Sequence, residues 1–356
     1  MDAKGAKESL DRLITKQRVA FYKPIQVAEI LNHVRSGKEI TINDVPNVET
    51  YRNPSKRWRD SVTRELIDQV STSSQKFQDN LFDRNAMPPE TLSVLAKENT
   101  KYPGVVERYI YQHFRLRQQR IARLAELLRD ATFAAFRLDS FLGEFARDRS
   151  IKRSIDKAYE IVVYALFNTL VKHMRVKIEV QADPSQIDLL RAFEEFARLV
   201  LGIDAEHPSL TIEASLYRAG ATNAADRGLD MWANFGAVVQ VKHLTLTDQL
   251  ADDICTEVAA DRIIIVCKDS EKETIERVLQ QLGHRVRGVI VQSQLIRWYD
   301  EALRGRFSGR LGKDLLASLR DEFRHEFRYS ETFEDFYKRR EYDRVPKSSS
   351  PFWQED

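Results

Sequence analysis

The sequence predicts an α+β or α/β fold, in which a mostly helical N-terminal region precedes a mixed central sheet flanked by helices. Two patterns predict it. Apolar residues recur at helical spacing through residues 1–175, and from Val176 onward short strand-like segments alternate with helical ones. We therefore expect a helical region, then a sheet-containing core, then a charged helical tail. Their expected bounds are 1–175, 176–305 and 306–356.

The N-terminal region is expected to consist of amphipathic helices. Apolar residues over 24–37 follow a helical period that stops at Gly37, and a second helix begins after Asn53 and Pro54. A long helical tract over 104–146 and an apolar, buried helix over 154–174 follow. The second helix carries one apolar stripe: Trp58, Val62, Leu66 and Val70.

The core begins with segments that alternate like strands. A helix that starts at Asp183-Pro184 and ends at Gly202 separates the first two strands, 175–181 and 210–220. Two more strands, 227–232 and 237–244, flank a turn over 233–236. The remaining elements are expected to be helices over 247–259, 271–282 and 293–303, with strands over 262–267 and 288–292.

The composition indicates a cytoplasmic protein that is not in a membrane. No apolar run is long enough to span a bilayer, and the N-terminus lacks the apolar stretch of a signal peptide. Cys255 and Cys267 have no second Cys or His at metal-ligand spacing, which suits a reducing compartment. The net charge of +2 does not exclude nucleic acid as a partner, because clustered charge matters more than the total.

The predicted hairpin, residues 225–244, carries charged and polar residues on otherwise apolar strands; its sequence is "ADRGLDMWANFGAVVQVKHL". Asp230 lies on its first strand, and Gln240 and Lys242 lie two apart on its second, so the latter two share a face. A carboxylate, an amide and an ammonium beside apolar residues are costly to bury without a partner. A divalent cation such as Mg²⁺, which takes oxygen ligands, and a phosphate would be suitable partners.

The spacing D-x9-Q-x-K resembles the PD-(D/E)XK nuclease signature, with Leu229 in place of its leading proline. The stretches 217–246, 49–63 and 71–82 resemble the HaeII family of type II restriction endonucleases. The shorter DRGLD…QVK element also resembles the Mrr-type nucleases, so an Mrr-like enzyme acting on modified DNA is an alternative. A DNA-binding protein with a degenerate, inactive nuclease core is another.

The HaeII-family resemblance implies hydrolysis of both strands of a specific double-stranded DNA sequence, which is a palindrome related to RGCGCY if the specificity follows the family's namesake. It implies that the helical region 1–175 serves DNA recognition or dimerisation and that 176–305 is the catalytic core. It implies a PD-(D/E)XK core, Mg²⁺ as the cofactor with Mn²⁺ as a substitute, a homodimer, and a cognate DNA methyltransferase as genetic partner. On this resemblance Asp230 binds the metal, Gln240 is a neutral second ligand beside the carbonyl of Val241, and Lys242 positions the attacking water.

A glutamine in the acid position leaves the metal site one negative charge short. Glu213 is the first candidate for an additional acid, and Glu194 and Glu195 are the next. Asp226 is the nearest other carboxylate, and it either binds the metal or caps the turn. We expect His243 to face away from Lys242, as a packed or surface residue.

A cationic segment in the N-terminal region is a candidate DNA-binding surface. Arginine can bind guanine and asparagine can bind adenine in the major groove, whereas hydroxyls and lysines contact phosphates. The alternative is a capped surface helix with Trp58 packed in the core. The candidate residues are Arg52, Asn53, Lys56, Arg57, Arg59 and Arg64, followed by Ser73 and Lys76.

Overall fold

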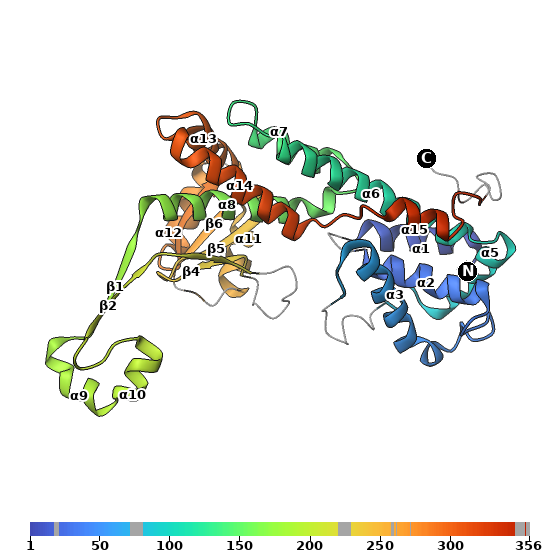
Figure 1. Cartoon of the computed structure of the whole chain (residues 1–356), viewed down its shortest axis with the longest axis horizontal. Coiled ribbons are helices and arrows are strands. Elements are labelled where there is room, and N and C mark those ends of the chain that lie inside the picture. The colour runs from blue at the N-terminus through green and yellow to red at the C-terminus, as the bar shows by residue number, and fades with distance from the viewer. Residues whose placement is uncertain are drawn as a thin grey trace.

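The protein has two lobes joined by a long helix, and an arm that projects from one of them (Figure 1). The computed structural model describes residues 1–17, 21–71, 81–219, 229–257, 260, 262–270, 272–345 and 353. The long helix is α6 (Val105–Arg129). Its first half packs in the core of the N-terminal lobe and its second half in the core of the sheet-containing lobe.

The N-terminal lobe is helical, as predicted, and the C-terminal segment returns to it (Figure 1). Its helices are α1 (Ala3–Thr15), α2 (Tyr22–Ser36), α3 (Arg52–Ile67), α5 (Pro89–Lys101) and α15 (Phe333–Arg339). The helix α2 ends at Gly37, whose φ of +61° is the left-handed conformation expected of a C-terminal glycine. On α3, Val62 and Leu66 of the predicted stripe are buried.

The second lobe contains a five-stranded mixed sheet of order β3-β4-β5-β6-β7. β3, β4 and β5 pair antiparallel, whereas β5, β6 and β7 pair parallel. The predicted mixed sheet is therefore confirmed. The strands are β3 (Leu216–Arg218), β4 (Met231–Ala233), β5 (Val238–Thr245), β6 (Ile263–Lys268) and β7 (Val286–Val291).

Helices cover both faces of this sheet. One face packs with α7 (Leu138–Arg147), α8 (Ile155–Met174), α13 (Gln292–Arg304) and α14 (Ser308–Glu326). The other packs with α11 (Asp248–Glu257) and α12 (Lys272–Leu282). Short 3-10 helices lie at Val48–Thr50, Lys152–Ser154 and Pro184–Gln186. The core around the sheet thus draws on residues from all three predicted parts of the chain.

The arm is a separate two-stranded antiparallel sheet of β1 (Lys177–Gln181) and β2 (Ser209–Glu213), with a helical tip (Figure 1). The tip starts at Asp183 and ends at Gly202, as predicted. It is not the predicted single helix, because it breaks into α9 (Ile187–Ala192), α10 (Glu194–Phe196) and a π-helical turn over Ala197–Leu201. A continuous helix depends on packing along one face, and the tip buries little apolar surface of its own.

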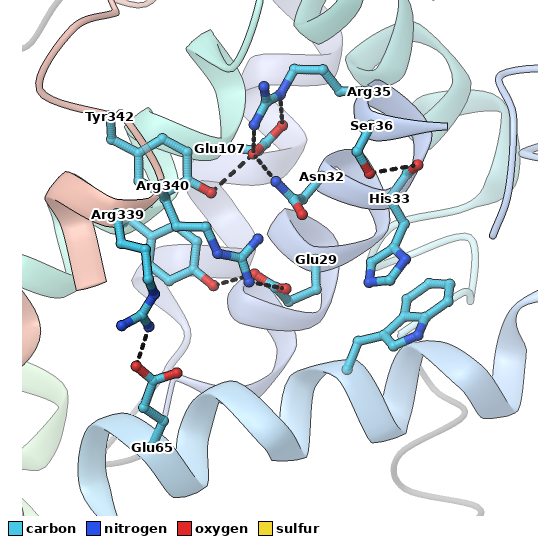
Figure 2. A network of polar contacts seen from close by, with 12 residues as sticks. Glu29, Asn32, His33, Arg35, Ser36, Glu65, Glu107, Arg339, Arg340 and Tyr342 are labelled. Carbon is cyan, nitrogen blue, oxygen red and sulfur yellow. Dashed lines mark hydrogen bonds and ion pairs between the residues drawn. The ribbon is translucent and has the colours of Figure 1, made fainter. Parts of the chain in front are cut away.

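Two buried carboxylates connect the C-terminal segment to the N-terminal lobe (Figure 2). Glu107 on α6 accepts hydrogen bonds from Arg35 Nε at 2.8 Å and from the Tyr342 hydroxyl at 2.9 Å. Glu29 on α2 accepts one from Arg340 at 2.8 Å, and burial raises the pKa of Glu29. Residues 340–345 are therefore part of the folded lobe.

Replacing Arg340 by methionine is expected to lower the free energy of unfolding by about 3 kcal/mol, because it leaves Glu29 buried without its cation. The raised pKa of Glu29 sets the sign of the pH effect: the loss is largest above that pKa and shrinks as acid protonates the carboxyl. Urea unfolding at pH 8 and pH 5 measures both. Arg339→Met is the matched control, since Arg339 and its partner Glu65 are both exposed and their pair is worth about 1 kcal/mol or less. Equal losses for the two variants would contradict this account.

Candidate active site

The β4–β5 hairpin places Asp230 beside Gln240. Met231 pairs with Val239, and continuing this antiparallel register by one residue puts Asp230 opposite Gln240. An Oδ2 atom of Asp230 accepts a hydrogen bond from the backbone N–H of Val241 at 2.8 Å. Burial nevertheless raises the pKa of Asp230. The first acid of the predicted motif is therefore a partly desolvated carboxylate fixed to the second strand.

Gln240 is buried, with 3% of its surface exposed, and its Oε1 atom has no hydrogen-bond partner among the described residues. Its neighbours Val239 and Val241 pack in the core that contains α8, whereas Val238 packs in the core that contains α11 and α12. A buried amide oxygen without a partner is costly. That cost is removed if the oxygen coordinates a cation.

Lys242 is half-buried and lies two residues beyond Gln240 on β5. Its charge lowers the pKa of Asp230, against the larger effect of burial, so the ammonium lies within electrostatic reach of the carboxylate. Asp230 and Gln240 thus lie opposite each other on the hairpin, and Lys242 follows on the same strand as Gln240. The next residue on β5, His243, packs against α8, where its Nδ1 contacts Oδ1 of Asp156.

Glu160 on α8 is a second carboxylate of this cluster, and the sequence reasoning missed it. Glu160 is buried, and burial followed by the charge of Asp230 raises its pKa to about 7. Its Oε2 accepts a hydrogen bond from Lys157 Nζ at 2.6 Å and lies 3.9 Å from Nη1 of Arg218 on β3. One signal was available: Glu160 is the only charged residue between Lys157 and Lys172, and a lone carboxylate in an apolar helix is typically paired or functional.

Glu160, and not Glu213, is the additional carboxylate that lies within electrostatic reach of Asp230. Glu213 is exposed at the end of β2, where its carbonyl accepts a hydrogen bond from Asn234 at 2.9 Å. Asn234 lies in the β4–β5 turn, at the opposite end of the hairpin from Asp230. Glu194 and Glu195 belong to the tip of the arm, where Glu194 pairs with Arg198. Asp226 lies outside the described residues.

The cluster offers oxygen ligands from side chains of several kinds. Within the described ranges, no group of three or more His, Cys, Asp or Glu residues could hold a metal ion. An ion at this site would therefore need the Gln240 amide or a backbone carbonyl in addition to the carboxylates of Asp230 and Glu160. Such an all-oxygen set fits a hard divalent cation, and the unpartnered Oε1 of Gln240 supports that fit.

The predicted DNA-binding segment forms the start of α3, but its side chains differ in how exposed they are and in whether they already form ion pairs. Arg59 is buried, forms an ion pair with Asp60 at 2.8 Å and donates to Gln26, so its prediction as a DNA contact is contradicted. Arg52 pairs with Glu49 at 2.7 Å, and Lys56 is half-buried. Ser73 and Lys76 lie outside the described residues. The exposed candidates are Asn53, Arg57 and Arg64.

Trp58 is partly buried and stacks on His33, with ring centroids 3.7 Å apart. This contact fixes α3 against α2 and agrees with the expected packing role of Trp58.

Replacing Arg59 by alanine is expected to lower the free energy of unfolding by about 3 kcal/mol, because it leaves Gln26 and Asp60 without a buried cation. Arg57→Ala on the exposed face should change stability by less than about 0.5 kcal/mol. If α3 binds DNA, Arg57→Ala weakens DNA affinity instead. Urea unfolding and fluorescence-anisotropy binding separate the two effects, and a stable Arg59→Ala variant with weakened DNA binding would restore Arg59 as a contact.

None of the helices within the described ranges has the length and apolarity needed to cross a membrane.

Comparison with known proteins identifies the family. The HaeII restriction endonuclease family model matches residues 6–342. The type II restriction enzyme HaeII of Haemophilus aegyptius is 47% identical over 348 residues, covering 97% of this chain and 98% of that protein. The type II restriction enzyme NgoBI of Neisseria gonorrhoeae is 42% identical over 348 residues, covering 96% of this chain and 98% of that protein. No solved structure matches the chain. The chain belongs to the HaeII family of type II restriction endonucleases.

Proposed function

We propose that this enzyme cuts both strands of a specific DNA sequence in a Mg²⁺-dependent reaction, with Mn²⁺ as a possible substitute, at a PD-(D/E)XK active site in the β4–β5 hairpin. Family membership supports DNA as the substrate. The observations that carry the metal site are the half-buried Asp230 and the buried Glu160, whose charges interact, and the unpartnered Oε1 of Gln240, a residue opposite Asp230 in the strand register.

The topology of the sheet supports the PD-(D/E)XK core. The three motif residues lie on an antiparallel hairpin, and the second strand of that hairpin continues into parallel pairing with β6 and β7. This order brings the end of β5, which carries Lys242, under the first turns of α8, where Asp156 contacts His243. Glu160 reaches the site from the same helix.

In this proposal Glu160 supplies the negative charge that is missing from the metal site because Gln240 stands in the acid position of the motif. Asp230 and Glu160 supply two negative charges, Gln240 and the carbonyl of Val241 supply neutral oxygens, and together they would hold one divalent ion. When bound, Mg²⁺ offsets negative charge that develops on the phosphate and lowers the pKa of a coordinated water. Burial is the main cause that raises the pKa of both carboxylates, and Lys157 lowers each pKa only in part.

Lys242 is the residue that faces the reacting phosphate in this proposal. Its ammonium orients the attacking water and stabilises negative charge on the phosphate oxygens. Asp230 holds its orientation through the backbone N–H of Val241, so the carboxylate and the lysine stay in fixed register on adjacent strands. Hydrolysis breaks a P–O bond of the DNA backbone and leaves a 5′-phosphate on one product.

The exposed side chains of α3 would recognise the DNA sequence. The HaeII-family resemblance relates that sequence to the palindrome RGCGCY. A palindrome presents the same sequence twice, related by a twofold axis, and a symmetric homodimer would place one active site on each strand. We further propose a cytoplasmic location and a cognate DNA methyltransferase as the genetic partner that protects the host sequence.

The affinity for Mg²⁺ in the absence of DNA is expected to rise by up to about tenfold from pH 6 to pH 8. Glu160 has a pKa raised to about 7, so below that pH a proton occupies the carboxyl and competes with the cation. Isothermal titration calorimetry at the two pH values measures the change. Glu160→Gln should flatten it, and a wild-type affinity independent of pH would contradict the assignment of Glu160 to the metal site.

Digestion of methylated and unmethylated plasmids of known sequence, with Mg²⁺ and with EDTA, tests the proposed function. We expect discrete fragments from unmethylated DNA with Mg²⁺ only, and sequencing of their ends gives one site. The Mrr-like alternative predicts cleavage of modified DNA alone. The alternative of an inactive nuclease core predicts DNA binding without Mg²⁺-dependent cleavage.

A further inference from the structure

The tip of the arm exposes a concentrated apolar surface. Its side chains bury only a small core of Leu190, Ala197 and Ile203, with a few partly buried neighbours. Single exposed apolar residues are ordinary, but a contiguous group indicates a binding surface. Six residues of the tip are between 43% and 78% exposed: Leu189, Phe193, Phe196, Leu199, Val200 and Leu201.

The arm that carries this surface has little support from the rest of the chain. Neither β1 nor β2 contains a buried residue, and among the strands of the described residues each pairs only with the other. Figure 1 shows the ribbon leading away from the sheet-containing lobe, with the tip at its far end. An isolated two-stranded ribbon is marginally stable in water. A partner that covers the tip would stabilise the arm.

The charge of the arm argues against DNA as that partner. Residues 177–213 contain three Lys or Arg and eight Asp or Glu, a net charge of −5. Because the whole chain carries +2, the remainder carries +7. The acidic arm is repelled by phosphates and attracted to the basic main body of another molecule of this protein.

We propose that the arm tip docks on the main body of a second copy of this chain, and that the partner's arm makes the same contact in return. Six side chains that each contribute on the order of 100 Å² approach the roughly 800 Å² per partner of a standard interface, and a reciprocal exchange forms the contact twice. The choice of a second copy rests in part on the proposed function, in which a symmetric dimer places one active site on each strand of a palindrome.

The mass of the full chain in solution, measured by light scattering without DNA or Mg²⁺, tests the proposal. We expect the wild type to have twice the mass of one chain at micromolar concentration, and the double variant Leu199→Glu/Val200→Glu to be monomeric. Both side chains are exposed, so the variant should still fold and keep the wild-type circular dichroism spectrum. The matched control is Leu116→Glu/Leu127→Glu on α6, where both leucines are 45% exposed, and it should remain dimeric.

A monomeric wild type, or an arm variant that stays dimeric, would overturn the proposal. A photo-crosslinking amino acid at position 199, in a mixture of isotope-labelled and unlabelled chains, locates the contact. Crosslinks to partner residues outside 177–213 support docking on the body, whereas crosslinks between two tips contradict it. Because no cleavage is measured, a dimer that forms through the tip but cuts no DNA would support this inference while contradicting the proposed function.

Discussion

Replacing Lys242 by alanine is expected to reduce the rate of DNA cleavage by about 10²–10⁴-fold while leaving the affinity for DNA within a few-fold of wild type. The ammonium acts on charge that develops during the reaction, and Lys242 is one half-buried cation among many that can contact phosphates. Single-turnover cleavage with saturating enzyme measures the chemical step. Binding with Ca²⁺ in place of Mg²⁺ measures affinity without cleavage.

The matched control for Lys242→Ala is Lys177→Ala. Lys177 is an exposed lysine on β1 of the arm, and its removal should leave the cleavage rate unchanged. Unimpaired cleavage by Lys242→Ala would remove the lysine from the mechanism. Loss of DNA binding in that variant, with the cleavage step intact at saturation, would make it a binding residue only.

Replacing Glu160 by glutamine is expected to reduce cleavage by at least about 10²-fold and to raise the Mg²⁺ concentration needed for half-maximal rate. The amide keeps the shape of the side chain but removes one of the two carboxylate charges of the proposed metal site. The cleavage rate as a function of Mg²⁺ concentration separates weaker metal binding from a slower step at saturating metal.

Glu213→Gln is the control for this prediction, because Glu213 is exposed at the opposite end of the hairpin. It should retain wild-type cleavage and Mg²⁺ dependence. If Glu213→Gln abolishes cleavage and Glu160→Gln does not, the carboxylate that completes the site comes from the arm, and the assignment of Glu160 is wrong.

Much of the fold could be predicted from the sequence because its local signals agree with its packing. The strands of the sheet alternate or are short and apolar, and the turn around Gly236, with a φ of +87°, separates β4 from β5 as expected. The spacing of Asp230, Gln240 and Lys242 on this hairpin needs only the pairing of two neighbouring strands, so a sequence pattern can capture it.

The features that could not be predicted from the sequence depend on contacts between segments that are distant along the chain. Glu160 lies 70 residues before Asp230, and only the packing of α8 on the sheet brings the two carboxylates together. Arg59 appears as a surface cation in the helical pattern, yet Gln26 and Tyr22 from another helix enclose it. The broken helix at the tip of the arm shows the opposite case, where a regular sequence pattern has too little tertiary packing to support it.

The most direct test of the metal site is a crystal structure of the enzyme with DNA and Mn²⁺, in which anomalous scattering locates the ion. We expect the ion at roughly 2.0–2.3 Å from oxygens of Asp230, Glu160 and Gln240, with the carbonyl of Val241 completing the protein ligands. The Lys242 ammonium should lie beside the scissile phosphate. An ion held elsewhere, or a Gln240 side chain turned away from it, would contradict this account of the site.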